Sequence, residues 1–379
     1  MEETISLHKQ TSSNLQLDET YQLRFSSAVQ DEKWDAFLRQ TDSGALLQSS
    51  RWASLKQYTG WQIHRLIVEQ NRHIVAGSQL LLRSLPFPLG KIAYVPRGPI
   101  LAVDTPELGA LILKKLQAVA RAERLQLLII QPPHTYKALS HNLITLKFRP
   151  TQVKIAPRST MQIDLRCSHD DILAQMRRGT RANIRRGNRK GIVIRHGNEE
   201  DVGVFMKLHA ASSKRQGFST ASEDYYAQMW RLFVETGDGA LLISEYGGEP
   251  ISAMLVIGFG KTVWAKRFGW SGKQGKRKPN EILIWSAMKW AKSQGYHWFD
   301  QDGVKWEAAE ALLNKQAVSE SVKKSPSYFK LGFGGQPRLF PEATAYVYNP
   351  ILRFGYTSLF PKLSRWSVTK RLLKKMQLG

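Results

Sequence analysis

The sequence predicts an α/β (α+β) protein made of two successive units that share one order of helices and strands. Its 379 residues exceed what one ordinary hydrophobic core supports, so two domains are expected. Hydrophobic residues make up 42% of the chain and include 11 tryptophans, which suits packed interiors and excludes a disordered basic protein. Each half shows the order helix–helix–strand–strand–strand–helix–strand, without detectable similarity between the two half-sequences.

The elements of each half follow from hydrophobic periodicity and from turn residues. In the first half we expect helices over 31–40, 50–58 and 106–123, and strands over 62–68, 74–83, 91–95 and 125–130. Pro132 and Pro133 end the last of these strands, because proline lacks the N–H that a central strand needs. In the second half we expect helices over 200–214, 222–235 and 281–294, and strands over 239–246, 250–259, 262–268 and 296–300.

The charge balance indicates a polyanionic partner. The chain has 55 Lys and Arg against 31 Asp and Glu, a formal net charge of +24. Nucleic acid, anionic lipid and a phosphorylated substrate would each complement this charge, which alone does not select among them. The single cysteine, Cys167, excludes an internal disulfide and a multi-cysteine zinc site. No nearby histidine is arranged to activate it, so we interpret it as structural.

The two ends of the chain differ in character. Residues 1–20 are polar and are expected to be flexible, with no apolar core of a signal peptide. No apolar run approaches the roughly 20 residues of a membrane span, so we expect a cytoplasmic protein. After Glu342 no further acid occurs, and basic residues alternate with apolar ones over 362–376. That pattern suits packing on the first unit or contact with the cytoplasmic face of a membrane.

A strongly basic segment runs from Ile172 to His196, with eight Lys or Arg residues and no acid. On a helical wheel its apolar residues share one face, and the opposite face carries Arg178, Arg181, Arg185 and Arg189. Because like charges on one helix face repel, we expect an anionic partner, either a phosphate backbone or a lipid surface. A solvated face is the alternative.

Several catalytic signatures are absent from the sequence. We find no P-loop, no cluster of histidine, cysteine and carboxylate residues at metal-ligand spacing, and no nucleophile elbow. His297 and Asp300 are three positions apart on an expected strand and therefore face opposite sides. We therefore expect no metal and no diffusible cofactor, and chemistry that depends on positioning and charge stabilisation.

Three blocks carry a resemblance to a known family. In the run from Ser327 to Gly335, Phe329 offers a stacking face, Lys330 a point charge for phosphate, and the glycines close backbone approach. This run follows the block from Trp298 to Val304, and the block from Tyr94 to Pro99 lies far upstream. In this order they resemble the Fem family of aminoacyl-tRNA-dependent peptidoglycan transferases, which add amino acids to the stem peptide of a cell-wall precursor.

The resemblance implies a fold and a division of the chain. Fem proteins look like two GNAT acyltransferase units in tandem, and the expected element order is similar to that fold. We therefore expect one unit over 21–156, joined by the C-terminal stretch 343–379, and a second over 157–342. No segment sustains a heptad pattern, so the chain is similar to members without a long coiled-coil arm. Its extra residues fall at 305–325, which we expect to be a polar insertion.

The resemblance also implies roles for matched residues. Phe329 and Lys330 match a pair that places the tRNA 3′ end and stabilises the developing oxyanion, and Asp300 matches the Asp…Gly block before it. We read Asp300 as structural or orienting. Tyr94 and Arg97 match residues that line the cleft, whereas Lys56 and Arg215 match residues that contact the pyrophosphate of the precursor. On their own, these side chains could equally be core aromatics, turn-stabilising ion pairs or packing residues.

The implied function is transfer of an amino acid from aminoacyl-tRNA to an amine on the stem peptide of a peptidoglycan precursor, either UDP-MurNAc-peptide or lipid II. One alternative is an acyl-coenzyme A-dependent N-acyltransferase of the same fold. Against it, the loop 272–278 departs from the Q/R-x-x-G-x-G/A pattern that cradles coenzyme A, although its four basic residues could serve another phosphate. The other alternative is an RNA-binding protein without chemistry, which would not need the Phe329–Lys330 and Asp300 blocks.

Overall fold

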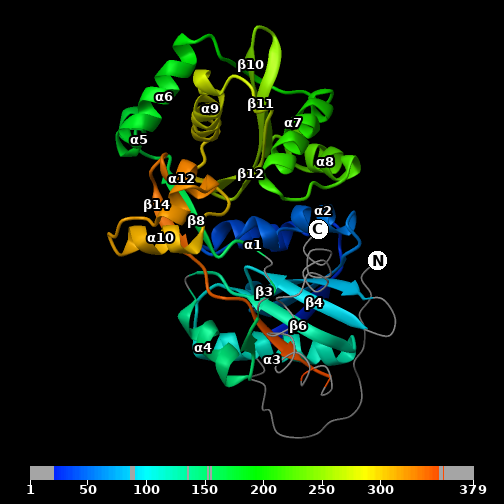
Figure 1. Ribbon diagram of the computed structural model, residues 1–379. Coiled ribbons are helices and arrows are strands. Elements are labelled where there is room, and N and C mark those ends of the chain that lie inside the picture. Colours follow the sequence, from blue (N-terminus) through cyan, green and yellow to red (C-terminus); the bar gives the residue numbers. More distant parts are fainter. Residues whose placement is uncertain are drawn as a thin grey trace, which may run out of the picture.

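The computed structural model describes residues 21–85, 90–134, 136–151, 153, 156–349 and 353. The segment 1–20 and the basic stretch 362–376 lie outside these residues. Two α/β units are stacked in Figure 1, and the helices α1 (Glu32–Gln40) and α2 (Ser50–Gln57) lie between them. The α/β architecture expected from the sequence is confirmed.

The first unit is built on a mixed sheet with the strand order β1-β2-β3-β4-β6-β15-β7, in which β5 pairs with β3. Its strands are β1 (Tyr21–Ser26), β2 (Gln62–Gln70), β3 (His73–Ser84), β4 (Lys91–Pro96), β5 (Ile100–Leu101), β6 (Leu125–Gln131), β7 (Arg149–Pro150) and β15 (Thr344–Val347). Strands β4 and β6 are parallel and are connected by α3 (Pro106–Ala122). Strand β15 returns from the far end of the described chain to lie between β6 and β7.

Alternation along β4 decides what each face of this sheet contacts. Ala93 and Val95 face the core formed with α3 and α4 (Lys137–Thr145). Ile92 and Tyr94 face the opposite side, where Ala53 of α2 packs. Successive side chains of a strand point to opposite faces, so β4 supports the outer core with one set of residues and faces the centre of the molecule with the other.

The second unit has a mixed sheet with the strand order β14-β8-β13-β12-β11-β10-β9. Its strands are β8 (Ser159–Asp164), β9 (Val193–His196), β10 (Gly239–Tyr246), β11 (Glu249–Phe259), β12 (Thr262–Trp270), β13 (Trp298–Asp300) and β14 (Gln336–Leu339). Its helices are α5 (His169–Gln175), α6 (Arg178–Arg189), α7 (Asp201–Gln216), α8 (Glu223–Met229), α9 (Pro279–Ser293), α10 (Trp306–Leu313), α11 (Glu320–Lys323) and α12 (Pro326–Leu331). A π turn, Trp230–Val234, continues α8.

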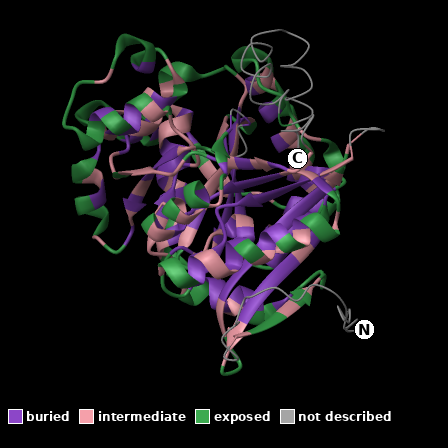
Figure 2. Cartoon of the chain, turned by 90° about the horizontal axis from the view of Figure 1, so that it is seen from below, coloured by how far each residue is buried: buried purple, intermediate pink, exposed green. Residues whose placement is uncertain are grey.

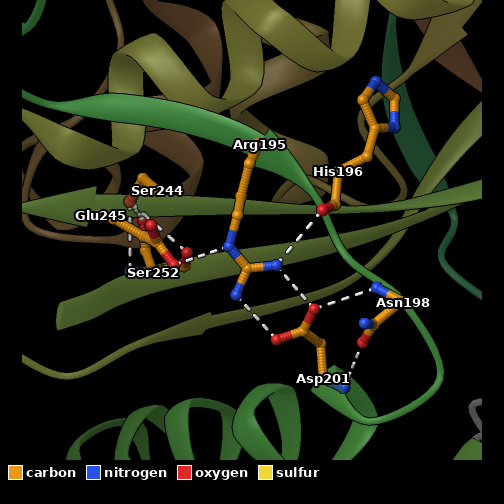
Figure 3. A network of polar contacts seen from close by, with 7 residues as sticks. All are labelled: Arg195, His196, Asn198, Asp201, Ser244, Glu245 and Ser252. Carbon is orange, nitrogen blue, oxygen red and sulfur yellow. Dashed lines mark hydrogen bonds and ion pairs between the residues drawn. The ribbon is translucent and has the colours of Figure 1, made fainter. Parts of the chain in front are cut away.

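A polar network fixes the edge strand β9 to the body of the second unit (Figure 3). Arg195 on β9 donates to Glu245 on β10 at 2.7 Å and to both carboxylate oxygens of Asp201, at 2.6 and 2.8 Å. Asp201 begins α7 and also accepts from the backbone N–H of Asn198 at 2.9 Å. The hydrogen bond from Arg195 lowers the pKa of Asp201. This network joins strand, loop and helix, and so has a structural role.

One expectation about local structure was wrong. The basic helix expected to start near Ile172 is broken, because the backbone at Met176 is extended (ψ 151°) and separates α5 from α6. The segment 305–325, expected to be a polar insertion, carries the two short helices α10 and α11, in which Ala308 and Val322 are fully buried. The expected absence of a long arm is confirmed for the described residues, whose longest helix is the 17-residue α3.

Apolar side chains of the two units share one buried cluster. Figure 2, seen from below, shows that the sheet strands are mostly buried, whereas the helices around them carry many exposed residues. Trp52 and Leu55 of α2, with Leu46 just before it, pack in one hydrophobic cluster with Phe205 of α7 and Tyr225 of α8. Arg51 of α2 also forms an ion pair with Asp238, next to β10. Because apolar side chains from both units bury each other, the elements between the two sheets form a shared core.

Candidate active site

In the second unit, the parallel strands β12 and β13 diverge after three paired residues, which leaves space for a site between them. Strand β12 pairs with β13 only from Thr262 to Trp264, opposite Trp298 to Asp300, where β13 ends. The remaining residues of β12, including Lys266, have no partner on that side within the described strands. In open α/β sheets, ligands bind beyond the carboxyl ends of strands at such a point.

A cavity of about 370 Å³ lies at this opening. Both units contribute to its wall: Trp52, Lys56, Tyr94 and Arg97 come from the first, and Lys266, Arg267, Asp300, Asp302 and Gly303 from the second. The volume is in the range of small-molecule sites. The cavity therefore brings together four of the residues that the sequence indicated, Lys56, Tyr94, Arg97 and Asp300.

Asp300 is buried at the end of β13 and makes only internal contacts. Its carboxylate accepts hydrogen bonds from Thr160 Oγ1 at 2.6 Å, from Gln162 Nε2 at 3.1 Å and from the N–H of Asp302 at 2.8 Å. Burial raises the pKa of Asp300, and these hydrogen bonds oppose that change only in part. These contacts fit the orienting role that we expected for this residue.

Lys330 lies in the last turn of α12, and its ammonium donates hydrogen bonds to backbone carbonyls. Its Nζ donates to the carbonyls of Gln301, Asp302 and Gly303 at 2.7, 3.0 and 2.7 Å. An ammonium has three donors, so all are occupied. The sequence placed Lys330 in a glycine-rich run, but a short helix, α12, carries it, and its ammonium positions the segment after β13.

Phe329 is packed rather than free. Its ring lies edge-on to Phe333, with centroids 5.4 Å apart, and contacts the core of the second unit. In this arrangement the ring does not line the cavity. The geometry therefore favours packing over base stacking for Phe329.

An ion pair in the cavity wall was not predicted from the sequence. Lys266 Nζ lies 3.0 Å from Asp302 Oδ2, and only 8% of the Lys266 side chain is exposed. Burial opposes ionisation of Asp302, but Lys266, Lys330 and Arg267 outweigh it and lower the pKa of this carboxyl. Basic residues on β12 next to the end of its parallel partner were the signal that could have revealed the pair.

Lys56 is buried without an acidic partner among the described residues. Its Nζ lies 5.1 Å from the centroid of the Trp52 ring, and Lys266 Nζ lies 4.8 Å from the same centroid. Burial, together with Arg267, Lys266 and Arg83, lowers the pKa of Lys56 to about 7. No anion in the described structure neutralises this lysine, and an anionic ligand placed beside it would stabilise its charged form.

Tyr94 and Arg97 form the wall opposite, on and after β4. The Tyr94 hydroxyl is buried with no hydrogen-bond partner in the described structure, and burial raises its pKa. Arg97 donates through Nη2 to the carbonyl of Pro157 and lies over the ring of Phe340, whereas its buried Nη1 has no partner among the described residues. Burial lowers the pKa of Arg97 to about 10, where it remains charged at neutral pH. Both side chains keep unused polar atoms.

The remaining expected site residues lie away from the cavity wall. Arg215 lies in the last turn of α7, donates to the carbonyl of Trp270 and stacks over its ring at 5.0 Å, so the geometry does not support a contact with phosphates in this cavity. On α6, Arg178, Arg185 and Arg189 are exposed. Arg181 is different, because its Nη1 donates to the carbonyls of Ala174 and Met176 at 2.9 and 3.1 Å.

Metal-binding groups of side chains and membrane-spanning helices are both absent from the residues that the structure describes. No group of three or more His, Cys, Asp or Glu residues in this part of the chain could hold a metal ion. Among the same residues, no helix is both long enough and apolar enough to cross a membrane.

Family models match each half of the chain. The FemAB family model matches residues 29–149. An acetyltransferase (GNAT) domain model matches residues 174–301. The cavity described above lies where the two matched regions meet.

Curated relatives agree with the first of these models. A "Lipid II:glycine glycyltransferase" of Staphylococcus epidermidis is 27% identical over 234 residues, which is 59% of this chain and 56% of that protein. A protein of the same name from Staphylococcus aureus is 24% identical over 269 residues, or 67% of this chain and 64% of that protein. The matched region thus spans less than two thirds of these relatives.

Solved structures agree on the fold. The crystal structure of FemX superposes with a TM-score of 0.73 at 20% identity, covering 85% of this chain and 96% of that one. A tandem GNAT protein from the clavulanic acid biosynthesis pathway has a TM-score of 0.51 at 13% identity, covering 87% and 99%. The tandem GNAT-like fold expected from the sequence is therefore confirmed. In its first-half family match, in its curated relatives and in its fold, the chain is therefore similar to proteins of the Fem family.

Proposed function

We propose that this protein is an aminoacyltransferase that moves an amino acid from aminoacyl-tRNA to an amine on the stem peptide of a peptidoglycan precursor. The observation that carries this proposal is the cavity between the units, with its cationic wall at the opening between β12 and β13. The names of the curated relatives, which describe glycine transfer to lipid II, support the acceptor class. Aminoacyl-tRNA and UDP-MurNAc-peptide are cytoplasmic, and lipid II is a membrane lipid, so we place the protein in the cytoplasm, where it could reach lipid II at the membrane surface.

The cavity suits an acyl transfer that starts from an activated ester. The acceptor ammonium first loses a proton to solvent, and the neutral nitrogen then attacks the ester carbonyl. The bond to the tRNA 3′ oxygen breaks, and the second proton lost by the nitrogen goes to that oxygen, so the products are an amide and a tRNA hydroxyl. Such a reaction needs position and charge stabilisation more than it needs a nucleophilic side chain. Lys56, Arg97, Lys266 and Arg267 supply positive charge on the wall.

Within this proposal, Lys56 and Arg97 bind the phosphates of the precursor. Lys56 has no acidic partner in the described structure, and Arg97 keeps an unpartnered buried N–H. A phosphate would satisfy both groups, because buried donors and charges are costly when they are unpaired. Tyr94 lies beside Arg97 and offers a hydroxyl to the same ligand.

The tRNA would contact a basic surface that extends beyond the four arginines expected from the sequence. The loop 272–278 packs on the C-terminal end of α6, where Arg277 Nη1 donates to the carbonyl of Lys190 at 2.8 Å. Exposed cations of both segments therefore share one surface: Arg178, Arg185, Arg186, Arg189, Lys190, Lys273 and Lys276. Within the described structure none of these seven forms a salt bridge, which favours a polyphosphate partner.

The direct test is incubation of the protein with charged tRNAs that each carry one labelled amino acid. Each is combined with UDP-MurNAc-peptide or with lipid II, and product masses are measured. We expect one precursor to gain the mass of one or more amino acid residues, and hydrolysis of the aminoacyl-tRNA beforehand to abolish the product. Absence of a mass gain with every tRNA and both precursors would overturn the proposal.

An acyl-coenzyme A-dependent N-acyltransferase is the second candidate, because the GNAT model matches 174–301. In these enzymes a helix N-terminus binds the pyrophosphate of the cofactor. Here α9 begins with Pro279, which lacks an N–H, directly after Lys278 in a left-handed conformation (φ 61°). Saturable binding of labelled coenzyme A that tRNA does not displace would favour this candidate over aminoacyl transfer.

A further inference from the structure

Asp302 is a carboxylate in the cavity wall to which the proposed function assigns no task. The acceptor in that function is an amine, which is protonated in water at neutral pH. An ammonium that enters a cavity lined by lysine and arginine is repelled unless a carboxylate is near. An acceptor ammonium therefore needs a carboxylate in the cavity wall.

Three aspartates line the cavity: Asp42, Asp300 and Asp302. Asp42 is exposed to solvent. Asp300 is buried, accepts three hydrogen bonds from the protein and has a raised pKa. Only Asp302 is both shielded, with 18% of its side chain exposed, and held ionised by surrounding cations.

Asp302 also has an oxygen available. Its Oδ2 contacts Lys266 Nζ at 3.0 Å, whereas no donor among the described residues forms a hydrogen bond with Oδ1. A carboxylate can accept from several donors at once. The ion pair with Lys266 therefore leaves Oδ1 of Asp302 available to accept a hydrogen bond from a ligand.

The backbone fixes where this carboxylate lies. Asp302 has a left-handed conformation (φ 47°), which is uncommon for a residue with a side chain. Lys330 holds the carbonyls before, at and after this position, and Asp300 accepts the N–H of Asp302. Both contacts maintain the turn that places the side chain at the cavity wall.

We propose that Asp302 binds the ammonium of the acceptor and so selects amine-bearing precursors, with Lys330 as its positioning residue. This inference rests on the proposed function. It explains why a cavity that is otherwise cationic keeps one ionised carboxylate at the end of β13. The phosphates would lie toward Lys56 and Arg97, and the amine toward Asp302, so that one molecule spans the cavity between the two units.

A binding experiment without the tRNA donor tests this assignment. The probes are UDP-MurNAc-pentapeptide with lysine at its third position and the same molecule with norleucine there, which lacks only the amine. Titration calorimetry of the wild type should show tighter binding of the lysine probe, by about tenfold or more, as for a hydrogen bond between charged groups. In Asp302→Asn the ratio of the two affinities should fall to about one, with the affinity for the norleucine probe unchanged.

The control is Asp42→Asn, which alters another carboxylate of the same cavity and should keep the wild-type ratio. Lys330→Met should lower the ratio as well, which a purely structural role would not do. If Asp302→Asn weakens both probes equally, or if Asp42→Asn removes the preference, the assignment is wrong while the proposed function stands. If the wild type binds neither probe nor lipid II, the precursor site itself is wrong, and both proposals fall.

Discussion

Lys330 is bound to three carbonyls, and this changes what its substitution should do. The family resemblance suggested a lysine that stabilises an oxyanion. In the structure its removal leaves the carbonyls of residues 301, 302 and 303 without their donor. Because all three N–H groups of the Lys330 ammonium already donate to carbonyls, Lys330 can stabilise an oxyanion only if the turn rearranges.

We therefore expect Lys330→Met to lower stability and activity together. Unsatisfied buried acceptors cost about 1–3 kcal/mol each, so a loss of about 2–4 kcal/mol is expected once partial hydration is allowed for. At temperatures where the variant is folded, kcat should fall, and high concentrations of charged tRNA should not restore it. Urea unfolding and steady-state kinetics measure both effects, with the exposed Lys324→Met as the control. A variant with normal stability and a kcat reduced by about 10²–10³ would return Lys330 to a direct role.

Lys56 should make both ligand binding and stability depend on pH. Its pKa is about 7 in the folded protein, against 10.5 as the ordinary value. Between these values the unfolded chain binds one more proton than the folded chain, so stability should rise as the pH increases from about 7 to 10.5. Lys56→Met has no such group, and its stability should lack this rise. Urea unfolding of both proteins at several pH values measures the difference.

Binding of an anion should raise the pKa of Lys56 again. At pH 8 most Lys56 side chains are neutral, and a phosphate placed beside them favours the charged form. UDP-MurNAc-peptide should therefore bind with uptake of a proton at pH 8, and with little uptake at pH 5.5. Calorimetry in buffers of different ionisation enthalpy measures the uptake. Equal uptake by the wild type and Lys56→Met at pH 8 would assign the proton to another group.

At the scale of elements, α6 and the loop 272–278 act as one basic surface. Arg185→Glu/Arg189→Glu should weaken tRNA binding and lower the slope of log K against log salt concentration by about 1 per lost phosphate contact. The matched control is Lys114→Glu/Arg121→Glu, which reverses two exposed charges on α3 in the first unit. Both double variants change net charge equally. An equal loss of affinity in both would mean that overall charge, and not this surface, governs binding.

The elements that were predicted from the sequence are longer and more regular than those that were missed. Long periodic segments such as α3 and β3 were predicted within a few residues. Short strands were not: β14 has four residues and includes Pro337, and β15 has four residues whose partners are remote in the chain. Pairing of such strands is set by tertiary contacts, which periodicity does not report. For α12, Ser325 followed by Pro326 is a helix-start signal that the glycine-rich interpretation overlooked.

The candidate site was predictable to the extent that its residues lie on regular elements. Tyr94 and Asp300 lie on β4 and β13, and both strands were expected from the sequence. The partner of Asp302 was not predictable, because it depends on where β12 and β13 stop pairing. Arg181 lies on the expected arginine face, but the break at Met176 exposes carbonyls that bind its guanidinium. Both outcomes come from backbone geometry that residue types alone do not determine.

At the scale of the whole molecule, the two units share the cluster that contains α2. Leu55 is fully buried and packs with side chains of α7 and α8 from the second unit. Leu113 of α3 is equally buried but packs only within the first unit. The cavity has walls from both units, so its shape depends on the shared core, and separation of the units would destroy the site.

We therefore expect the chain to unfold in one cooperative transition, because neither unit can bury this cluster alone. Leu55→Ala and Leu113→Ala should each cost about 2–5 kcal/mol through the cavity they create. Although they lie in different clusters, both should shift the same single transition in scanning calorimetry, and limited proteolysis during heating should cleave both units together. Two resolved transitions, with Leu113→Ala lowering only one of them, would show that the units unfold independently.

The Leu55→Ala variant should in addition lose affinity for the precursor at temperatures where it remains folded, because α2 carries Lys56 and Trp52 into the cavity wall.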